Sequence, residues 1–385
     1  MPASPSLLIV PARFKTGKLY TQIATTSAGL VLGSSGDFNV TRGTTATRFN
    51  SAGLIESVAS GVPRLDYYTS GGTAGCPALL VEAAATNLAL HSRDLTNAVW
   101  SGTTVTTAKN AVGADGTASG ATTITATAAS GTVLQALSHA SQSRVFSAYI
   151  RRVSGTGAIQ LTTNGGTNWT TVTITSGYTQ VACAAQTVAS GTVGIRLAVS
   201  GDVIEVDFTQ GEVGPVATSP MATTTGSVTR NADVINVSGA VSGCIGQTEG
   251  TIYWEGAINR IDRVFFALAS GASTTQNIRL QGSSTGLMQF VVQSSAIQAN
   301  IGTSGAITLG QFYKVAVAYK ENDFVFFLNG AQVGVRDTSG TLPTNLNSVY
   351  FLNPNGTEIT DQRCRAVALY TTRLTDSELA ALTTL

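Results

Sequence analysis

Charged side chains are scarce in this sequence: Asp, Glu, Lys and Arg make up 11% of its 385 residues, and the net charge is +1. Ordinary soluble domains contain about 25% charged residues. The few basic residues form no cluster, whereas binding to a nucleic-acid backbone requires several phosphate contacts at once. We therefore expect no nucleic-acid partner. Weak charge also means weak repulsion between copies, which suits a subunit of a larger assembly better than a free monomer.

Cysteine and histidine are also rare. The cysteines form no Cys-x-x-Cys pair, and the two histidines, His91 and His139, are far apart in the chain. Cytoplasmic thiols stay reduced, so we expect each cysteine to be a small buried apolar residue rather than half of a disulfide. Without a His-Glu-x-x-His motif we expect no transition metal, no other cofactor and no Ser-His-Asp set. The cysteines are Cys76, Cys183, Cys244 and Cys364.

Long hydrophobic runs are missing as well. A helix that spans a bilayer needs about 20 consecutive apolar residues. The N-terminal run Leu7–Val10 ends at Pro11 and has no basic segment before it, whereas a secretory signal has a longer apolar core and a positively charged start. We therefore expect no membrane insertion, and accumulation in the cytoplasm of the cell that makes the protein.

Small, hydroxylated and β-branched residues fill the sequence instead, and 41 residues are glycine. This composition favours pleated sheets joined by tight turns. Phe146, Ala148 and Ile150 occupy every second position of one run, which places them on the same face of a strand. Many short strands with Gly and Ser at the turns indicate all-β sandwiches.

Two local patterns stand out near the C-terminus. Asn329-Gly330 separates the apolar runs Phe324–Leu328 and Ala331–Val335, and Asn-Gly favours a two-residue hairpin turn. Thr375 and Glu378 have the spacing of a capping box, which predicts a short helical turn after the last strand. Together these patterns predict an antiparallel hairpin and a closing helix.

Three parts of the chain resemble known families. The segment 312–385 resembles the C-terminal half of laminin-G-like, concanavalin-A-like sandwiches. Two groups of motifs resemble proteins of tailed phages and prophages, and Met221 departs from the second group, where an aromatic residue or Ile is more usual. The first group is Thr41-Arg42, Ala46-Thr47-Arg48, Asn50, Gly53-Leu54-Ile55, Pro63–Tyr67, Leu79–Glu82, Thr86-Asn87-Leu88, Asn97 and Trp100; the second is Gln210–Gly214, Ala217–Pro220 and Thr229–Asp233.

The resemblance implies three folded parts in a fixed order. Residues 1–90 are expected to be an irregular unit that attaches to the virion. Residues 91–220 are expected to form a jelly roll similar to carbohydrate-binding modules, and residues 221–250 a linker. Residues 251–385 are expected to form the laminin-G-like, concanavalin-A-like sandwich.

The resemblance also implies a function. We expect a structural protein of a tailed-phage virion, in a tail fibre or as a capsid decoration, that binds glycans of the host surface and is not an enzyme. Its partners are other virion proteins and further copies of itself, with a homotrimer favoured, and it is assembled in the host cytoplasm. The alternatives are a purely architectural subunit without a ligand and, less favoured, a polysaccharide depolymerase.

Exposed aromatic side chains that stack on sugar rings are the residues to examine for binding. We expect Trp169, Tyr178 and Tyr350 to bind a ligand, since Trp254 is in phase with core residues and Trp100 completes a packing motif.

Carboxylates supply the remaining candidates. Glu205 and Asp207 are two apart in a strand, so they should share a solvated outer face, where they could also serve as an acid/base pair. Asp202, Glu205 and Asp323 are conceivable ligands of a structural calcium ion, although their spacing is not diagnostic.

Overall fold

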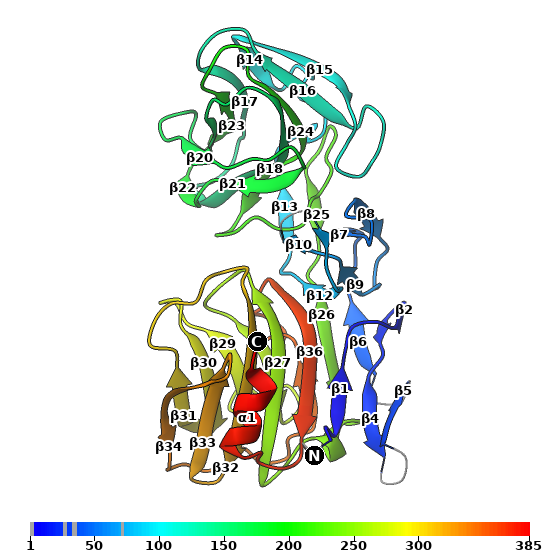
Figure 1. Ribbon diagram of the computed structural model, residues 1–385, viewed down its shortest axis with the longest axis vertical. Helices are drawn as coiled ribbons and strands as arrows, with labels where there is room; N and C mark the ends of the chain where they lie inside the picture. The colour runs from blue at the N-terminus through cyan, green and yellow to red at the C-terminus, as the bar shows by residue number, and fades with distance from the viewer. Residues whose placement is uncertain (1–3, 26–28, 33–36, 71–72) are drawn as a thin grey trace.

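Two β-sandwiches are stacked along the long axis of the molecule, with a smaller group of strands between them (Figure 1). The structure is a computed structural model that describes residues 4–25, 29–32, 37–70 and 73–385. Helical residues in these ranges are confined to the short turn η1 (Ser242–Cys244) and the helix α1 (Asp376–Thr383). The all-β prediction is therefore confirmed.

The first sandwich joins an eight-stranded and a five-stranded sheet. Phe146 and Ile150 of the larger sheet meet Ile195 and Leu197 of the smaller one in a common core. The larger sheet contains β13 (Ala85–Asn87), β15 (Val105–Ala111), β16 (Ala121–Ala126), β18 (Gln142–Ser154), β21 (Thr179–Ala182), β22 (Gln186–Val188), β24 (Val203–Val213) and β25 (Val228–Arg230). The smaller one contains β14 (Ser101–Thr103), β17 (Gly131–Ala136), β19 (Ile159–Thr162), β20 (Thr170–Val172) and β23 (Thr192–Leu197).

The second sandwich joins a ten-stranded and a nine-stranded sheet. Trp254 and Phe265 pack across its core with ring centroids 4.7 Å apart. The ten-stranded sheet contains β1 (Leu7–Ile9), β4 (Gln22–Thr25), β5 (Gly29–Leu32), β9 (Arg64–Asp66), β12 (Ala78–Val81), β27 (Glu249–Ile258), β32 (Phe312–Lys320), β33 (Asp323–Leu328), β34 (Ala331–Asp337) and β36 (Gln362–Tyr370). The nine-stranded sheet contains β2 (Phe14–Lys15), β3 (Lys18–Leu19), β6 (Phe38–Thr41), β26 (Val234–Ser238), β28 (Val264–Ala269), β29 (Gln276–Gly282), β30 (Met288–Ser294), β31 (Ala296–Gly302) and β35 (Ser348–Tyr350).

The two local C-terminal predictions are confirmed. Asn329 and Gly330 both have positive φ, 48° and 86°, as a hairpin turn of this type requires, and β33 pairs antiparallel with β34. The side chain of Thr375 accepts from the backbone N–H of Glu378, while the Glu378 side chain accepts from that of Thr375. The helix that follows packs Leu379 against an apolar cluster on the outer face of the ten-stranded sheet.

The first ninety residues do not form a separate unit. Strands β1 and β12 pair antiparallel with β36, near the end of the chain, and β6 pairs with β26. The expected boundary at residue 90 therefore does not follow the sheets, because most N-terminal strands complete the second sandwich and β13 already belongs to the first. Two hairpins lie apart from the large sheets, β7 (Ala46–Phe49) with β8 (Ile55–Val58) and β10 (Thr69–Ser70) with β11 (Thr73–Ala74).

The expected linker over residues 221–250 is also largely part of the sheets. β25 pairs with β13 in the first sandwich, and β26 pairs with β6 and β35 in the second. The chain therefore passes directly from one sandwich into the other between Arg230 and Val234. This short crossing brings the residues of the second motif group to the junction.

Candidate functional site

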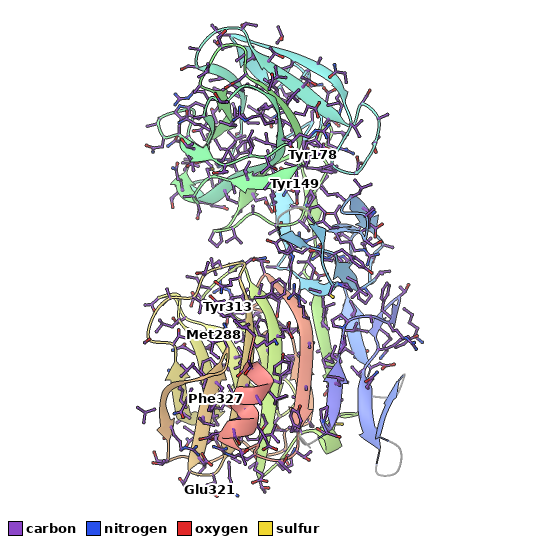
Figure 2. The ribbon with its side chains drawn as sticks, in the orientation of Figure 1. Tyr149, Tyr178, Met288, Tyr313, Glu321 and Phe327 are labelled. Atoms are coloured by element: carbon purple, nitrogen blue, oxygen red, sulfur yellow. The ribbon has the colours of Figure 1, made fainter. Side chains whose placement is uncertain are left out.

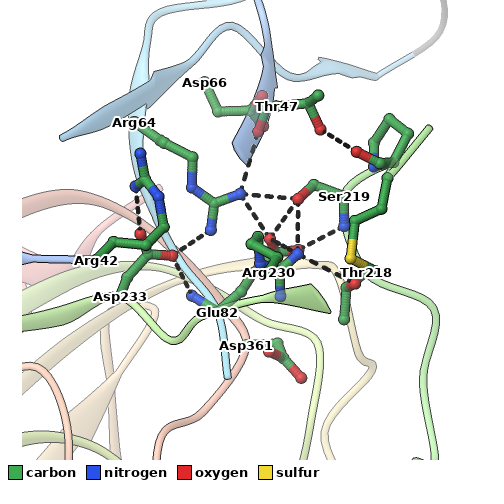
Figure 3. Close-up of polar contacts among 12 residues, drawn as sticks. Arg42, Thr47, Arg64, Asp66, Glu82, Thr218, Ser219, Arg230, Asp233 and Asp361 are labelled. Carbon is green, nitrogen blue, oxygen red and sulfur yellow. Dashed lines mark hydrogen bonds and ion pairs between the residues drawn. The ribbon is translucent and has the colours of Figure 1, made fainter. Parts of the chain in front are cut away.

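A buried network of charged residues occupies the junction between the sandwiches (Figure 3). The residues come from stretches far apart in the sequence, and each belongs to one of the phage-like motifs. Their side chains are almost completely inaccessible, with exposed fractions between 0% and 6%. We call Arg42, Arg64, Glu82, Arg230 and Asp233 the junction network.

Asp233 holds two of the arginines. It lies just before β26, and its Oδ1 atom accepts from Arg42 Nη1 at 2.8 Å. Its Oδ2 atom accepts from Arg64 Nη2 and, at 3.0 Å, from the backbone N–H of Glu82. Glu82 directly follows β12 of the ten-stranded sheet, and Asp233 directly precedes β26 of the nine-stranded sheet. The Asp233 carboxylate therefore joins the ends of strands from both sheets of the second sandwich.

Glu82 holds the third arginine and reaches the crossing segment. Its Oε2 atom is 2.7 Å from Arg64 Nη1 and 2.8 Å from Arg230 Nη1. Ser219 donates its backbone N–H to Oε1 at 2.8 Å and its hydroxyl to Oε2 at 2.6 Å. The carboxylate thus binds β9, β25 and the segment after β24 at one point.

The electrostatics of this network favour the charged forms. Burial opposes ionisation of Glu82, but the charges of Arg230 and Arg64 and the bond from Ser219 hold its pKa well below its usual range. Burial likewise opposes the charge of Arg64, yet Asp233 and Glu82 raise its pKa above the usual range. A buried charge is tolerated only when it is paired and hydrogen-bonded. Each charge of the network is paired and hydrogen-bonded, although the Nε atoms of Arg64 and Arg230 have no partner among the described residues.

Two further buried carboxyls flank the network and behave differently. Burial raises the pKa of Glu212, in β24, to about 7, although hydrogen bonds from Thr218 oppose the shift. Burial also raises the pKa of Asp361 to about 6, and the charge of nearby Glu82 adds to that shift. Thr218 connects Glu212 to the network, because its hydroxyl donates to Glu212 and accepts from Arg230 Nη1 at 3.2 Å.

The junction network is closed to ligands and suited to a mechanical role. Its carboxylate oxygens accept from arginines, backbone N–H groups and a serine hydroxyl, and the side chains are buried. A separate ion pair lies beside it, since Arg363 Nε donates to Asp66 Oδ2 at 2.7 Å. The arrangement can fix the two sandwiches relative to one another, and its depth leaves no room for substrate chemistry.

The aromatic residues expected to bind a ligand are not brought together. Trp169 lies in the loop between β19 and β20 of the first sandwich and is half-buried. The guanidinium carbon of Arg196 lies 4.6 Å from its ring centre, and a Cβ atom at Gly166 would be 2.9 Å from the indole. Part of the ring is therefore already covered by protein atoms.

Tyr178 and Tyr350 lie elsewhere and are engaged in packing. Tyr178 lies near Tyr149 on the first sandwich (Figure 2), and its hydroxyl donates to the Val112 carbonyl at 2.8 Å. Tyr350 belongs to β35 of the second sandwich, is 8% exposed and donates to the Gly271 carbonyl at 3.0 Å. Tyr350 thus has little surface to offer a sugar ring.

The other two tryptophans behave as predicted. Trp254 is 0% exposed in the core of the second sandwich. Trp100 is buried in the core of the first and donates its indole N–H to the Leu90 carbonyl at 3.0 Å. Both are packing residues.

Glu205 and Asp207 do not form an exposed pair. Glu205 is half-buried and paired with Arg151. Asp207 is fully buried, contrary to expectation, and accepts from Arg93 Nε at 2.8 Å and from the Ala114 backbone N–H at 2.9 Å. Asp207 lies opposite Tyr149 on the outer face of β24, and Arg93 and the segment with Ala114 cover it there. The alternation breaks only at the next residue, Phe208, which has a φ of 45°.

The conceivable calcium ligands are also separated. Asp202 accepts from the Gly157 backbone N–H at 3.2 Å, Glu205 is paired as described, and Asp323 is paired with Arg336 and Arg373. Among the residues that the structure describes, no group of three or more His, Cys, Asp or Glu could hold a metal ion.

The remaining sequence candidates are structural. Cys183, Cys244 and Cys364 are free and buried as expected, but Cys76 is exposed. The sequence Gly282–Gly286 fits the pattern Gly-x-Ser-x-Gly, yet it connects strands β29 and β30 rather than a strand and a helix, as a nucleophile turn requires. His139 accepts a hydrogen bond from the Gly191 backbone N–H at 3.2 Å.

An open groove of about 380 Å³ lies between the edge strands β31 and β34 of the second sandwich. Gly334, with a φ of 62°, lies close to Ile301 at this point, and the pairing of β34 with β33 is irregular there. The groove is lined by Asn300, Ile301, Gly302, Gly334, Val335, Arg336, Asp337 and Thr338. Its lining is mostly polar and contains no aromatic residue.

Residues 252–380 match the family model of the concanavalin A-like lectin/glucanases superfamily. This match covers most of the second sandwich, which is therefore concanavalin-A-like, as predicted. A comparison with curated proteins finds no match. Within the described residues, no helix is both long enough and apolar enough to cross a membrane.

Several solved structures are similar in part. The carbohydrate-binding module CBM40 of the Ruminococcus gnavus IT-sialidase, bound to α2,3-sialyllactose, has 16% identity and a TM-score of 0.32, covering 36% of this chain and 84% of its own. Domain 4 of the Geobacillus stearothermophilus arabinanase AbnA, in complex with arabinotriose, has 17% identity and a TM-score of 0.34, covering 44% and 84%. A Limulus polyphemus SAP-like pentraxin has 13% identity and a TM-score of 0.29, covering 35% and 69%. Scores of this size carry no functional inference.

Proposed function

We propose that this protein is a non-catalytic structural protein of a tailed-phage virion, which carries two β-sandwiches for adhesion to glycans of the host surface. The observation that carries the proposal is the junction network. Residues of both phage-like motif groups, distant in sequence, meet there in one buried set of ion pairs. The resemblance therefore concerns residues that act together in the fold.

A rigid junction suits an adhesion protein of a particle. Binding to a surface through two modules gains strength when the modules are held at a fixed spacing, because the second contact then needs no further ordering. The chain crosses between the sandwiches within a few residues, and ion pairs clamp both sides of the crossing. The concanavalin-A-like sandwich supports the glycan-binding part of the proposal.

Attachment to other virion proteins and assembly as a homotrimer in the host cytoplasm belong to the same proposal. The scarcity of charge supports assembly, because copies of a nearly neutral chain repel one another weakly. Glu205 and Asp207 each have an arginine partner, and this supports a non-catalytic protein over a depolymerase.

The proposal is tested on phage particles from the strain that encodes the protein. An antibody against the purified protein should label tail fibres or the capsid surface in electron micrographs, and the purified protein should bind the bacterial cells that these particles infect. Recovery of the protein only from the particle-free fraction, without binding to cells, would contradict the proposal. Release of reducing sugar from host polysaccharide, lost in Glu205→Gln, would favour the depolymerase instead.

A further inference from the structure

One buried arginine of the first sandwich lacks the partners that the junction arginines have. Arg144 is 4% exposed, and its Nε and Nη1 atoms are buried without a hydrogen-bond partner. Throughout the described ranges, no acidic side chain pairs with it and no acceptor receives a bond from its guanidinium. Buried polar groups in folded proteins nearly always have a partner, so an exception calls for an explanation.

The Arg144 side chain lies at one end of the first sandwich and faces its interior. Arg144 lies near the start of β18, two residues before Phe146, which is a core residue. Residues two apart in a strand face the same side, so the Arg144 side chain also faces inward. Across the sheet it is paired with Gln186 of β22 and Val213 of β24. One further pair on this face, Gln142 with Val188, lies between this row and the end of the strands.

The row has the chemistry of a small polar site. The Gln186 side chain accepts from the Thr163 hydroxyl at 2.9 Å, and Thr163 directly follows β19 of the opposite sheet. Gln186 is half-buried, and its side-chain amide N–H group donates to no acceptor among the residues that the structure describes. Val213 is 44% exposed, so this end of the sandwich is open to solvent. We call Arg144, Thr163, Gln186 and Val213 the mouth of the first sandwich.

The charge at the mouth is uncompensated. Burial lowers the pKa of Arg144, and no acidic group contributes an opposing shift. An arginine side chain nevertheless stays protonated in proteins, because its pKa in water is far above neutrality. The planar guanidinium fits a carboxylate through two parallel hydrogen bonds, and such a ligand would supply the missing partner.

We propose that the mouth of the first sandwich binds a carboxylate-bearing sugar, with the carboxylate on Arg144 and a sugar hydroxyl on Gln186. Thr163 is 1% exposed and positions the Gln186 side chain. The inference rests on the proposed glycan adhesion and narrows its ligand to acidic sugars. The uncharged Gln186 amide beside Arg144 favours a sugar over an acidic side chain of another protein, because an amide pairs with a ligand hydroxyl. The small exposed fraction of Arg144 favours a ligand group that enters from the edge.

The test uses the full chain and measures its thermal unfolding midpoint with sodium glucuronate. The control ligand is glucose at the same concentration, with sodium chloride added to give the same ionic strength. Glucose differs from glucuronate in lacking the carboxylate. The wild-type midpoint should rise by several degrees with glucuronate and not with glucose, because a ligand that binds only the folded state stabilises it. Arg144→Met should abolish this shift and, without ligand, should unfold at a higher temperature than the wild type. Arg263→Met serves as the control, since Arg263 is a partly exposed residue of the second sandwich, and it should keep the shift.

Other outcomes would overturn the inference. A glucuronate shift that persists in Arg144→Met, or a wild type that responds equally to glucose, shows that Arg144 does not select a carboxylate. Absence of any shift in the wild type, together with dissociation of an oligomer in Arg144→Met, shows that the arginine pairs with another subunit. If Arg144→Met does not fold, Arg144→Gln replaces it, with the same expected loss of the shift. If the wild type and Arg144→Met both bind cells, the proposed adhesion stands and only the acidic-sugar site is contradicted. If the wild type does not bind cells, the proposed adhesion itself is contradicted.

Discussion

Buried arginines at the junction and at the mouth differ in their partners. Arg42, Arg64 and Arg230 share the two carboxylates of Asp233 and Glu82 and bond to further backbone and hydroxyl groups. Arg144 is also buried, at 4% exposed, but has neither an ion pair nor a hydrogen bond in the part of the chain that is described. Burial alone therefore does not tell a structural charge from a binding residue. The set of partners distinguishes them.

The junction should fail when its charge balance is broken. In Asp233→Asn, Arg42 and Arg64 lose their shared carboxylate while remaining buried. Removing one partner of a buried pair costs about 3–5 kcal/mol, so we expect a loss of this order in the free energy of unfolding. Urea denaturation at pH 7, followed by tryptophan fluorescence, measures it. Asp262→Asn alters an exposed pair with Arg263 and should change stability by less than about 0.5 kcal/mol. Equal effects of the two substitutions would show that the junction network does not clamp the sandwiches.

The pH dependence of stability should reveal the two protonatable carboxyls beside the junction. The folded pKa of Glu212 is raised to about 7 and that of Asp361 to about 6. The folded state thus binds protons more strongly than the unfolded chain, and stability contributed by these groups is lost as the pH rises from about 5 to 8. The expected loss over this range is on the order of 4 kcal/mol for the two groups together.

Urea denaturation between pH 5 and pH 8 measures whether the free energy of unfolding falls as the pH rises. Glu212→Gln and Asp361→Asn should each flatten the profile, whereas Glu56→Gln, a partly exposed residue paired with Arg48, should leave its slope unchanged. A stability that rises between pH 5 and pH 8 would contradict the raised pKa values.

The smallest effect is expected at Trp169. Arg196 lies over its ring, and an exposed contact of this kind contributes about 0.5–1 kcal/mol. Trp169→Ala should therefore lower stability only slightly. It should leave the glucuronate shift of the first sandwich unchanged, since Trp169 is not part of the mouth. Loss of cell binding in this variant, with the glucuronate shift intact, would assign ligand contact to Trp169 as well.

Local features of the fold could be predicted from sequence because each depends on a few adjacent residues. Asn329-Gly330 fixes its own turn, and Thr375 with Glu378 forms the capping box. The N-terminal strands could not be placed this way. Leu7 pairs with Leu369, and no local pattern in such a short strand indicates a partner at the other end of the chain.

The candidate site shows the same limit. Motif resemblance singled out Arg42, Arg64 and Glu82, but their common destination depends on three-dimensional pairing. Alternation placed Asp207 on the correct face, opposite Tyr149, but it could not show that Arg93 and the segment with Ala114 cover this carboxylate. Arg144 carried a usable signal: it is in phase with Phe146 and Ala148, so the alternation itself directs a charge into the core.

The most direct test compares the free energies of unfolding of Arg64→Met and Arg144→Met at pH 7 in the absence of ligand. Both substitutions replace a buried guanidinium with an apolar side chain. Arg64→Met leaves Asp233 and Glu82 short of a partner and should destabilise the protein, whereas Arg144→Met removes an unpaired charge and should stabilise it. Opposite signs are the predicted result, and two changes of the same sign would contradict the distinction between a structural junction and a binding mouth.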